Sequence, residues 1–155
     1  MDEIEFAKKV DFVRKLKPNW FLSEDKSVAT PDEVERGGLL VNGRLPEEYI
    51  FFSLNYPAGY FAFMNIYSMV PGSEWYLIMK NKEYDSVVMP ENFIAFSDDE
   101  TGGYYGFIKQ ETRYSNEVYF WDSSSTESII SVKKNFFEFV INRAFQLEHF
   151  DINLP

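Results

Sequence analysis

Residues 93–122 read FIAFSDDETGGYYGFIKQETRYSNEVYFWD, and this stretch decides the fold class. It holds three short apolar runs, at residues 93–96, 104–108 and 118–121. Aromatic and β-branched residues favour strands, whereas the polar stretches between these runs are rich in Gly, Asp, Ser and Asn, which favour turns. The stretch therefore predicts an antiparallel meander.

The chain after the meander predicts one more strand and a helix. Residues 123–126 suit a turn, residues 129–132 suit a strand, and residues 135–138, Asn-Phe-Phe-Glu, resemble a capping box at the start of a helix. Apolar residues then recur with a period near 3.6 as far as Leu147.

The chain before the meander predicts helices. Phe6, Val10, Val13 and Leu16 have helical spacing, and Pro18 should stop that helix. Residues 30–33, Thr-Pro-Asp-Glu, are typical of a helix start, and residues 37–38, Gly-Gly, should end this short helix. Residues 46–48, Pro-Glu-Glu, open a third helix of about two turns.

The region between these helices and the meander is less regular. Residues 60–70 favour a strand before the turn dipeptide Pro71-Gly72, and residues 74–82 fit either a helix or a strand. This order predicts an α+β fold, a mainly antiparallel sheet of about four to six strands packed by helices. We expect one domain over residues 1–155, in which residues 1–29 form an N-terminal helix and a connector.

We expect the sheet and the last helix to supply much of the hydrophobic core. The residues expected there are Phe93, Ile94, Phe96, Phe107, Val118, Phe120, Phe136 and Phe139. With 45% hydrophobic and 26% charged residues, the 155-residue chain has the balance of a folded protein. Its aromatic content of 19% is unusually high and supports a dense core.

The charge is strongly acidic and unevenly spread. The 25 acids and 15 bases give a formal net charge of -10. Residues 45–108 hold nine acids but only the two bases Lys80 and Lys82, so seven of the ten excess charges lie in the middle of the chain. Such a field repels a phosphate backbone. We therefore expect a basic protein partner, with no direct nucleic-acid binding.

The sequence also bears on the compartment. There is no cysteine, the N-terminus MDEIEFAKKV lacks the pattern of a signal peptide, and no apolar run approaches the roughly 20 residues of a membrane span. These features predict a cytoplasmic protein without membrane attachment.

Asp98, Asp99 and Glu100, followed by Gly102 and Gly103, form the densest carboxylate cluster. The cluster is compatible with a solvated hairpin turn, with a surface for a basic partner, or with metal binding or acid/base catalysis. The EF-hand pattern of acids at alternating positions is missing. The glycines favour a hairpin over a phosphate loop, because a strand and not a helix follows them.

The remaining candidates are aromatic residues and one histidine. Trp121 and Asp122 end the third predicted strand, where Trp121 fits either the core or an interface. Tyr104 and Tyr105 should point to opposite faces of their strand, one buried and one exposed. His149, the single histidine, is expected on the surface in the last turn of a helix.

The order of these motifs resembles the SUKH superfamily, a domain shared by a fungal cell-wall-assembly regulator and many bacterial immunity proteins. The resemblance runs over residues 30–140. It rests on TPDEVERGG, LPEEYIFFSLNYPAGYF, FIAFSDDETGGYYGF, VYFWD and NFFEFV. The segment LLVNGR before Leu45 and the turn Pro-Ala-Gly at residues 57–59 depart from the family pattern.

The resemblance implies an α+β fold and no enzymatic activity. It also implies that the protein binds a secreted toxin, often a nuclease. Our hypothesis is an immunity protein of a polymorphic or contact-dependent toxin system. The alternative is an intracellular interaction module of a regulatory complex, like the cell-wall regulator. We expect no catalytic residue, metal or cofactor. The expected partner-binding residues are Asp98, Asp99, Glu100, Tyr104, Tyr105, Trp121 and Asp122.

Overall fold

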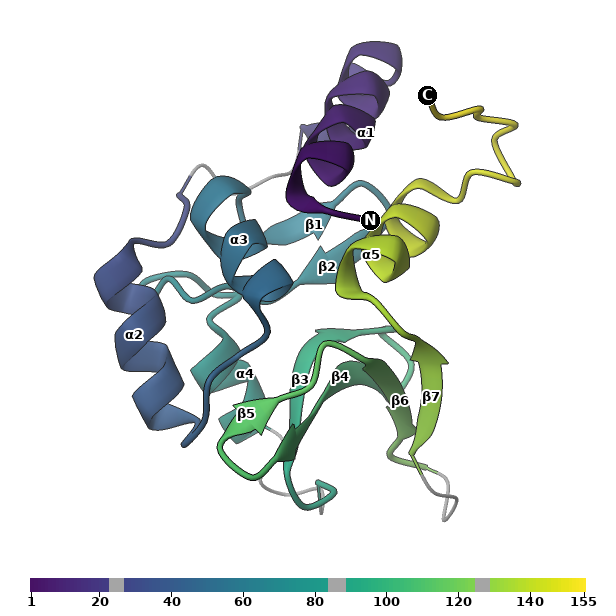
Figure 1. Cartoon of the computed structure of the whole chain (residues 1–155). Helices are drawn as coiled ribbons and strands as arrows, with labels where there is room; N and C mark the ends of the chain where they lie inside the picture. Colours follow the sequence, from purple (N-terminus) through teal and green to yellow (C-terminus); the bar gives the residue numbers. More distant parts are fainter. Residues whose placement is uncertain (23–26, 84–88, 125–128) are drawn as a thin grey trace.

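A computed structural model describes residues 1–22, 27–83, 89–124 and 129–155 of the chain (Figure 1). Its helices are α1 (Glu3–Leu16), the short 3-10 helix η1 (Pro18–Phe21), α2 (Pro31–Leu40), α3 (Glu47–Asn55), α4 (Leu77–Glu83) and α5 (Phe136–Phe145). Its strands are β1 (Gly59–Phe61), β2 (Met64–Ile66), β3 (Phe93–Asp98), β4 (Gly103–Gln110), β5 (Arg113–Tyr114), β6 (Val118–Asp122) and β7 (Ile130–Lys133). Within the described ranges, these elements confirm the predicted α+β class.

The larger sheet is the predicted meander. Its strand order is β3-β4-β6-β7, all antiparallel, and the two-residue strand β5 pairs with the end of β4. Strand β7 begins one residue later than predicted. The sheet forms the lower half of the molecule in Figure 1, while α1, α3 and α5 lie above it.

The prediction of a single strand over residues 60–70 is wrong. The chain forms the two short strands β1 and β2, which pair with each other as a hairpin. Ala62, between them, has a φ of 51°, a left-handed conformation that turns the chain back at once. The ambiguous stretch that follows is helical from Leu77, and Asn81 of α4 exchanges two hydrogen bonds with the backbone of Ala95 in β3.

The helix starts follow the sequence signals. Thr30 and Glu33 form the full capping box of α2: the Thr30 hydroxyl accepts from the Glu33 backbone N–H, and the Glu33 carboxylate accepts from the Thr30 N–H. Asn135 caps α5 by accepting from the backbone N–H of Glu138. These bonds satisfy donors that a helix start otherwise leaves without partners.

The prediction that Gly37 and Gly38 end their helix is wrong, because α2 continues to Leu40. Gly37 lies where α2 packs on the body of the protein, and a Cβ atom at this position would collide with the side-chain end of buried Met69. Close packing, and not chain termination, therefore explains this glycine.

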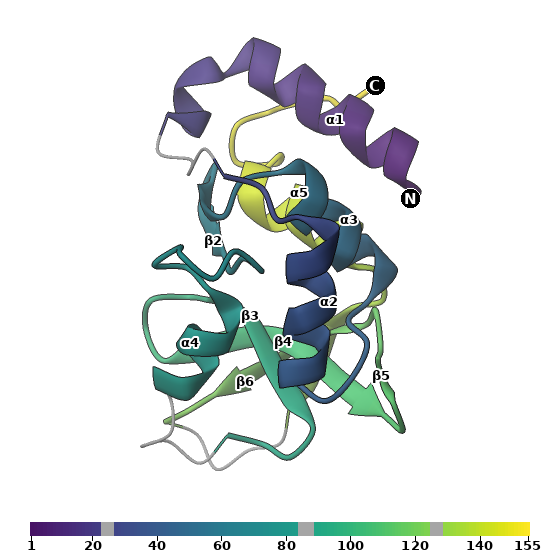
Figure 2. The same ribbon diagram turned by 90° about the vertical axis from the view of Figure 1, so that its left-hand side faces the viewer.

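Aromatic rings dominate the core. Phe136 of α5 is fully buried against Tyr49 of α3 and against Phe96 and Phe107 of the sheet. Phe6 of α1 stacks on Phe137 at 4.3 Å, so that α1 covers α5 from the outside (Figure 2). The core is thus built from helices and sheet together.

Seven of the eight predicted core residues are buried, and Phe120 is the exception. Its ring contacts Tyr105 at a centroid distance of 5.0 Å but remains half-exposed. On the same face, Gly103 has no side chain to cover the ring, and Ile130, opposite Phe120 in β7, is itself 55% exposed.

Candidate protein-binding surface

The carboxylate cluster lies in the turn that joins β3 to β4. The Asp99 carboxylate accepts hydrogen bonds from the backbone N–H groups of Thr101 (2.9 Å) and Gly103 (2.8 Å), and Gly102 has a φ of 95°. Burial alone would raise the pKa of Asp99, but these bonds and the charge of Arg143 hold it below its usual range. Asp99 is therefore built into a hairpin turn, as one of the sequence-based alternatives proposed.

Asp98 ties the hairpin to the smaller sheet. Its carboxylate accepts hydrogen bonds from the Tyr67 hydroxyl (2.5 Å), the Asn65 side-chain amide (3.2 Å) and the Glu100 backbone N–H (2.9 Å). The Asn65 side-chain oxygen in turn accepts from the Asp98 backbone N–H. The half-buried Asp98 side chain points to β2 and holds the turn in place.

Glu100 is the exposed member of the cluster. It has a φ of 64°, and its carboxylate accepts a hydrogen bond from the hydroxyl of Tyr60, which follows Gly59 in β1. Tyr60 is 41% exposed and meets Trp75 edge-on at 5.3 Å. We call Tyr60, Trp75 and Glu100 the hairpin surface.

Two observations describe the electrostatics of the hairpin surface. The hydrogen bond to Glu100 raises the pKa of Tyr60, with smaller contributions from burial and from the charges of Glu100 and Asp98. The Lys80 ammonium lies 4.9 Å from the centroid of the Trp75 ring, in a cation–π contact. The surface thus offers the Glu100 carboxylate beside Tyr60, whose ring meets Trp75. Tyr and Trp are enriched in protein interfaces.

Tyr104 and Tyr105 do point to opposite faces of β4, but the prediction that one is buried and the other exposed is wrong. Both are half-buried. Tyr104 stacks on Trp121 of β6, whereas Tyr105 packs on Phe139 of α5 at 4.8 Å and lies under Arg143. Each face of the strand is covered by a different neighbour, so neither ring is free.

Trp121 belongs to the core. It is 8% exposed, pairs directly across the sheet with Tyr104, and contacts Phe93 of β3. This placement fits the core alternative and leaves little of the ring for a partner. Asp122 is half-buried, and its carboxylate accepts from the backbone and hydroxyl of Ser124.

The structure therefore separates the seven predicted site residues. Glu100 is exposed, whereas Asp98, Asp99, Tyr104, Tyr105 and Asp122 are partly covered and Trp121 is buried. Sequence reasoning missed Tyr60 and Trp75. The signal in the sequence is the glycine at position 59. The structure explains it, because Gly59 has a left-handed φ of 89° and a Cβ atom there would lie 3.0 Å from the Trp75 indole nitrogen.

Among the described residues, no group of three or more His, Asp or Glu side chains is placed to hold a metal ion. His149 is exposed, but α5 ends at Phe145, so His149 lies in the turn after the helix and not in its last turn.

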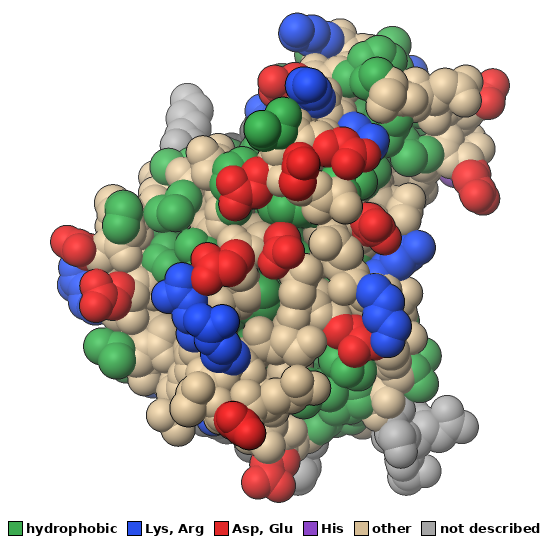
Figure 3. All heavy atoms as spheres, viewed as in Figure 1, with side chains coloured by type: hydrophobic (Ala, Val, Ile, Leu, Met, Phe, Trp, Pro, Cys, Tyr) green, Lys and Arg blue, Asp and Glu red, His purple; other side chains and the backbone are tan. Residues whose placement is uncertain are grey.

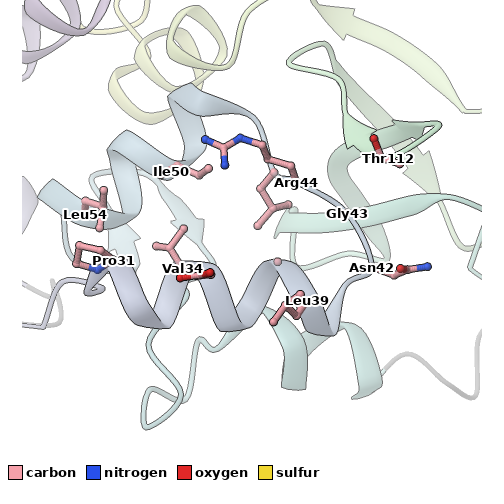
Figure 4. Close-up of a pocket in the computed structure, with 12 residues that line it drawn as sticks. Pro31, Val34, Leu39, Asn42, Gly43, Arg44, Ile50, Leu54 and Thr112 are labelled. Carbon is pink, nitrogen blue, oxygen red and sulfur yellow. The ribbon is translucent and has the colours of Figure 1, made fainter.

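A second surface feature is a groove between α2 and α3, with a volume of about 580 Å³ (Figure 4). Val34 and Ile50 point toward one another across it, and Pro31 and Leu54 lie together at one end. Asn42 and Thr112 mark the other end. We call this feature the α2–α3 groove.

The loop from α2 to α3 forms one wall of the groove and is fixed to β4 and β5. The Arg44 N–H donates to the Thr112 carbonyl (3.0 Å), and the Tyr114 N–H donates to the Arg44 carbonyl (2.8 Å). The Tyr114 hydroxyl donates to the Val41 carbonyl, and the Lys109 ammonium to that of Asn42. The groove is therefore preformed, and LLVNGR, which departs from the family pattern, supplies this wall.

Figure 3 shows how charge is distributed on one side of the molecule. Acidic side chains are spread over α3 and the lower end of α1, whereas basic side chains gather beside β5 and the α2–α3 loop. The basic residues of that region are Arg44, Lys109 and Arg113. The groove thus has a basic end on an acidic protein.

The comparisons with known proteins agree with the fold. A SUKH_6 family model, described as SMI1-KNR4 cell-wall, matches residues 33–140, about 70% of the chain. No curated protein matches the sequence. In the part of the chain that the structure describes, no helix has the length and apolar character needed to cross a membrane.

Proposed function

Because this chain belongs to the SUKH superfamily, we propose that it is an immunity protein, which binds a cognate secreted toxin and neutralises it without chemistry. The toxin system would be polymorphic or contact-dependent, and the toxin a nuclease. A SUKH domain is consistent both with toxin immunity and with an interaction module of the SMI1-KNR4 kind. Both functions depend on binding a protein.

The observation that supports this proposal is the hairpin surface. It places the exposed Glu100 carboxylate beside the rings of Tyr60 and Trp75, within the region that carries seven of the ten excess negative charges. A nuclease holds nucleic acid in a cationic groove, and an acidic surface can occupy that groove in place of the phosphates. The aromatic rings would supply apolar contact area.

Internal hydrogen bonds would hold the proposed surface ready. Asp98 and Asp99 accept hydrogen bonds from within the hairpin and from β2, so the turn is fixed before a partner arrives. A preformed surface loses less conformational entropy on binding. We propose that Asp98, Asp99, Tyr104 and Trp121 support the interface, while Glu100, Tyr60 and Trp75 make the contact.

The test begins with the gene neighbourhood. The toxin partner to use is the C-terminal domain of a large secreted protein encoded immediately upstream. Binding of this domain is measured by surface plasmon resonance against the wild type and two variants. Glu100→Gln removes the charge but keeps an acceptor for Tyr60, and should slow association and flatten its salt dependence. Tyr60→Ala should speed dissociation by about tenfold.

Glu111→Gln is the matched control for Glu100→Gln. Glu111 is also an exposed glutamate in a hairpin turn with a left-handed φ, of 59°, but it lies at the opposite end of β4. If the toxin domain binds both hairpin variants with wild-type kinetics, the hairpin surface is not the interface. If the toxin domain does not bind the wild type at all, immunity against that toxin is wrong.

An intracellular interaction module of a regulatory complex, like the cell-wall regulator, remains the second candidate, because the matching family model is described as SMI1-KNR4 cell-wall. An intracellular scaffold needs no toxin gene beside it. A neighbourhood without such a gene, together with recovery of the chain in a stable complex with regulatory proteins, would favour the scaffold.

A further inference from the structure

The groove side of α2 carries an apolar face that the protein itself covers only in part. Residues on the groove side recur at intervals of three and four along α2: Pro31, Val34, Glu35, Gly38 and Leu39. This spacing places them on one face of a helix. At the end of that face, Leu39 is 77% exposed and the adjacent Leu40 is 64% exposed. Leucines this exposed would remain in water if only a small molecule filled the groove.

We propose that a second copy of this chain docks on the α2–α3 groove, with the two α2 helices antiparallel and crossing at Gly38. The dimer is isologous, so each copy contributes the same surface. Leu39 of each copy then lies at the centre of the interface, against the apolar groove side chains of the other. This inference goes beyond the proposed function and does not depend on it.

The shape of α2 suits such a crossing. Gly38 has no side chain, and a Cβ atom placed there would meet no atom closer than the Gly43 carbonyl oxygen at 3.5 Å. The α2–α3 loop thus touches this side of half-buried Gly38, but without a side chain the helix surface is low here, and another helix can approach its backbone closely. On either side of this point, Val34 and Leu39 project as larger side chains that can pack into the partner.

The charges favour the antiparallel orientation. The first half of α2 carries Asp32, Glu33 and Glu35, whereas the loop after α2 and the neighbouring strands carry Arg44, Lys109 and Arg113. A two-fold axis at Gly38 brings the acidic end of each helix to the basic end of the other. A parallel arrangement would instead bring like charges together.

Some charged side chains near α2 already have a partner within the described part of the chain, and others do not. Arg44 forms an ion pair with Glu47 at 2.7 Å, and the Lys109 ammonium donates to a backbone carbonyl. Within the described residues, neither Glu35 nor Arg113 has an ion-pair partner. Pairing between copies would provide one for each, which offsets the repulsion between two chains of net charge -10.

The proposed dimer leaves the hairpin surface accessible. The hairpin turn precedes Gly103 at the start of β4, whereas Thr112, at the rim of the groove, follows the end of the same strand. A standard interface covers about 800 Å² on each partner, roughly a tenth of the 8602 Å² surface of this chain. Both surfaces can therefore be occupied in one assembly.

The first test is sedimentation velocity of the full chain between about 1 and 300 µM. We expect a monomer–dimer equilibrium, which Leu39→Glu should weaken by at least about tenfold, since it places two carboxylates at the crossing. Leu22→Glu is the matched control, because Leu22 is 78% exposed but follows η1 and does not line the α2–α3 groove. It should leave the dissociation constant unchanged.

The second test uses the symmetry of the interface. Glu35→Arg and Arg113→Glu should each dimerise at least about tenfold more weakly than the wild type, because each homodimer then contains two like-charge contacts. An equimolar mixture of the two variants should dimerise like the wild type, since each contact again joins opposite charges. Recovery on mixing also shows that both variants are folded.

The following results would overturn the proposal. A chain that sediments as a monomer over the whole concentration range does not use this groove for self-association. A dimer that tolerates Leu39→Glu is formed by another surface. Single charge variants that fail to recover on mixing, while their thermal unfolding matches the wild type, rule out the antiparallel pairing.

Discussion

The carboxylate of Asp98 accepts a 2.5 Å hydrogen bond from the hydroxyl of Tyr67, 31 positions earlier in the chain. The bond joins the end of β3 to the residue that follows β2, and the Tyr67 backbone N–H also donates to the Phe96 carbonyl at 2.7 Å. Two sheets that share no strand are thereby connected beside the hairpin surface. The Asp98 carboxylate, beside the hairpin surface, thus serves the fold.

This connection predicts different effects of two neighbouring carboxylates on stability. Asp98→Ala removes the acceptor of a charge-assisted bond and should lower the free energy of unfolding by about 1.5 to 3 kcal/mol. Glu100→Ala, at the exposed position, should change it by less than about 0.5 kcal/mol. Urea denaturation measures both values. Equal effects would show that Asp98 does not hold the hairpin.

The two adjacent glycines of α2 should respond in opposite directions to alanine. Gly37→Ala places a methyl group against buried Met69 and should destabilise the protein. At Gly38 a methyl group has room, so Gly38→Ala should stabilise the chain by about 0.5 to 1 kcal/mol through its better helix propensity. Thermal unfolding at low protein concentration checks both variants, and the same sign of change in both would contradict the packing described for Gly37.

The terminal helix provides a prediction about the core. Phe136 is fully buried among aromatic rings, so Phe136→Ala should lower the free energy of unfolding by about 3 to 5 kcal/mol. Phe63→Ala is the comparison, since Phe63 is 44% exposed in the turn between β1 and β2 and should cost far less. A loss below about 1 kcal/mol for Phe136→Ala would mean that α5 is not docked on the sheet as described.

Glu117, which precedes β6, predicts a pH dependence. Hydrogen bonds from Lys134, Ser131 and Tyr119 lower its pKa from 4.5 to about 2. Between these two values the unfolded chain binds more protons at this site than the folded chain does, so the contribution of Glu117 to stability is lost as the pH falls from 4.5 to 2.

Lys134→Ala should raise the pKa of Glu117, because Lys134 is the largest cause of its lowering. The side-chain carboxyl signal in an NMR titration measures this pKa directly. The variant should also lose less stability than the wild type on acidification through this range. An unchanged pKa in the variant would show that the Lys134 contact does not form in solution.

The fold was largely predictable because its signals are local. The capping box at Thr30 and Glu33, the strand runs of the meander and the Asn135 cap each depend on residues a few positions apart. The failures involve long-range packing. Whether Gly37 ends a helix or accommodates a neighbour is decided by Met69, 32 positions later, which no local pattern reveals.

The candidate binding surface was only partly predictable for the same reason. The turn at Asp98 to Glu100 was recognisable, but the burial of Trp121 depends on its cross-strand neighbour Tyr104 and on Phe93. Tyr60 meets Glu100 only after the β1–β2 hairpin has folded against the larger sheet, and Trp75 joins them through its contact with Tyr60. The α2–α3 groove combines a helix face with a loop and a turn from another part of the chain.

The stack of Phe6 on Phe137 has a practical consequence for work with fragments. The family match begins at residue 33 and ends at residue 140, inside α5, so it includes neither α1 nor the last turns of α5. A truncated protein cut at these limits would expose Phe137 to water and lose Phe145 from the interior. We expect such a fragment to aggregate when it is expressed, because the matched region is shorter than the core that α1 and α5 complete.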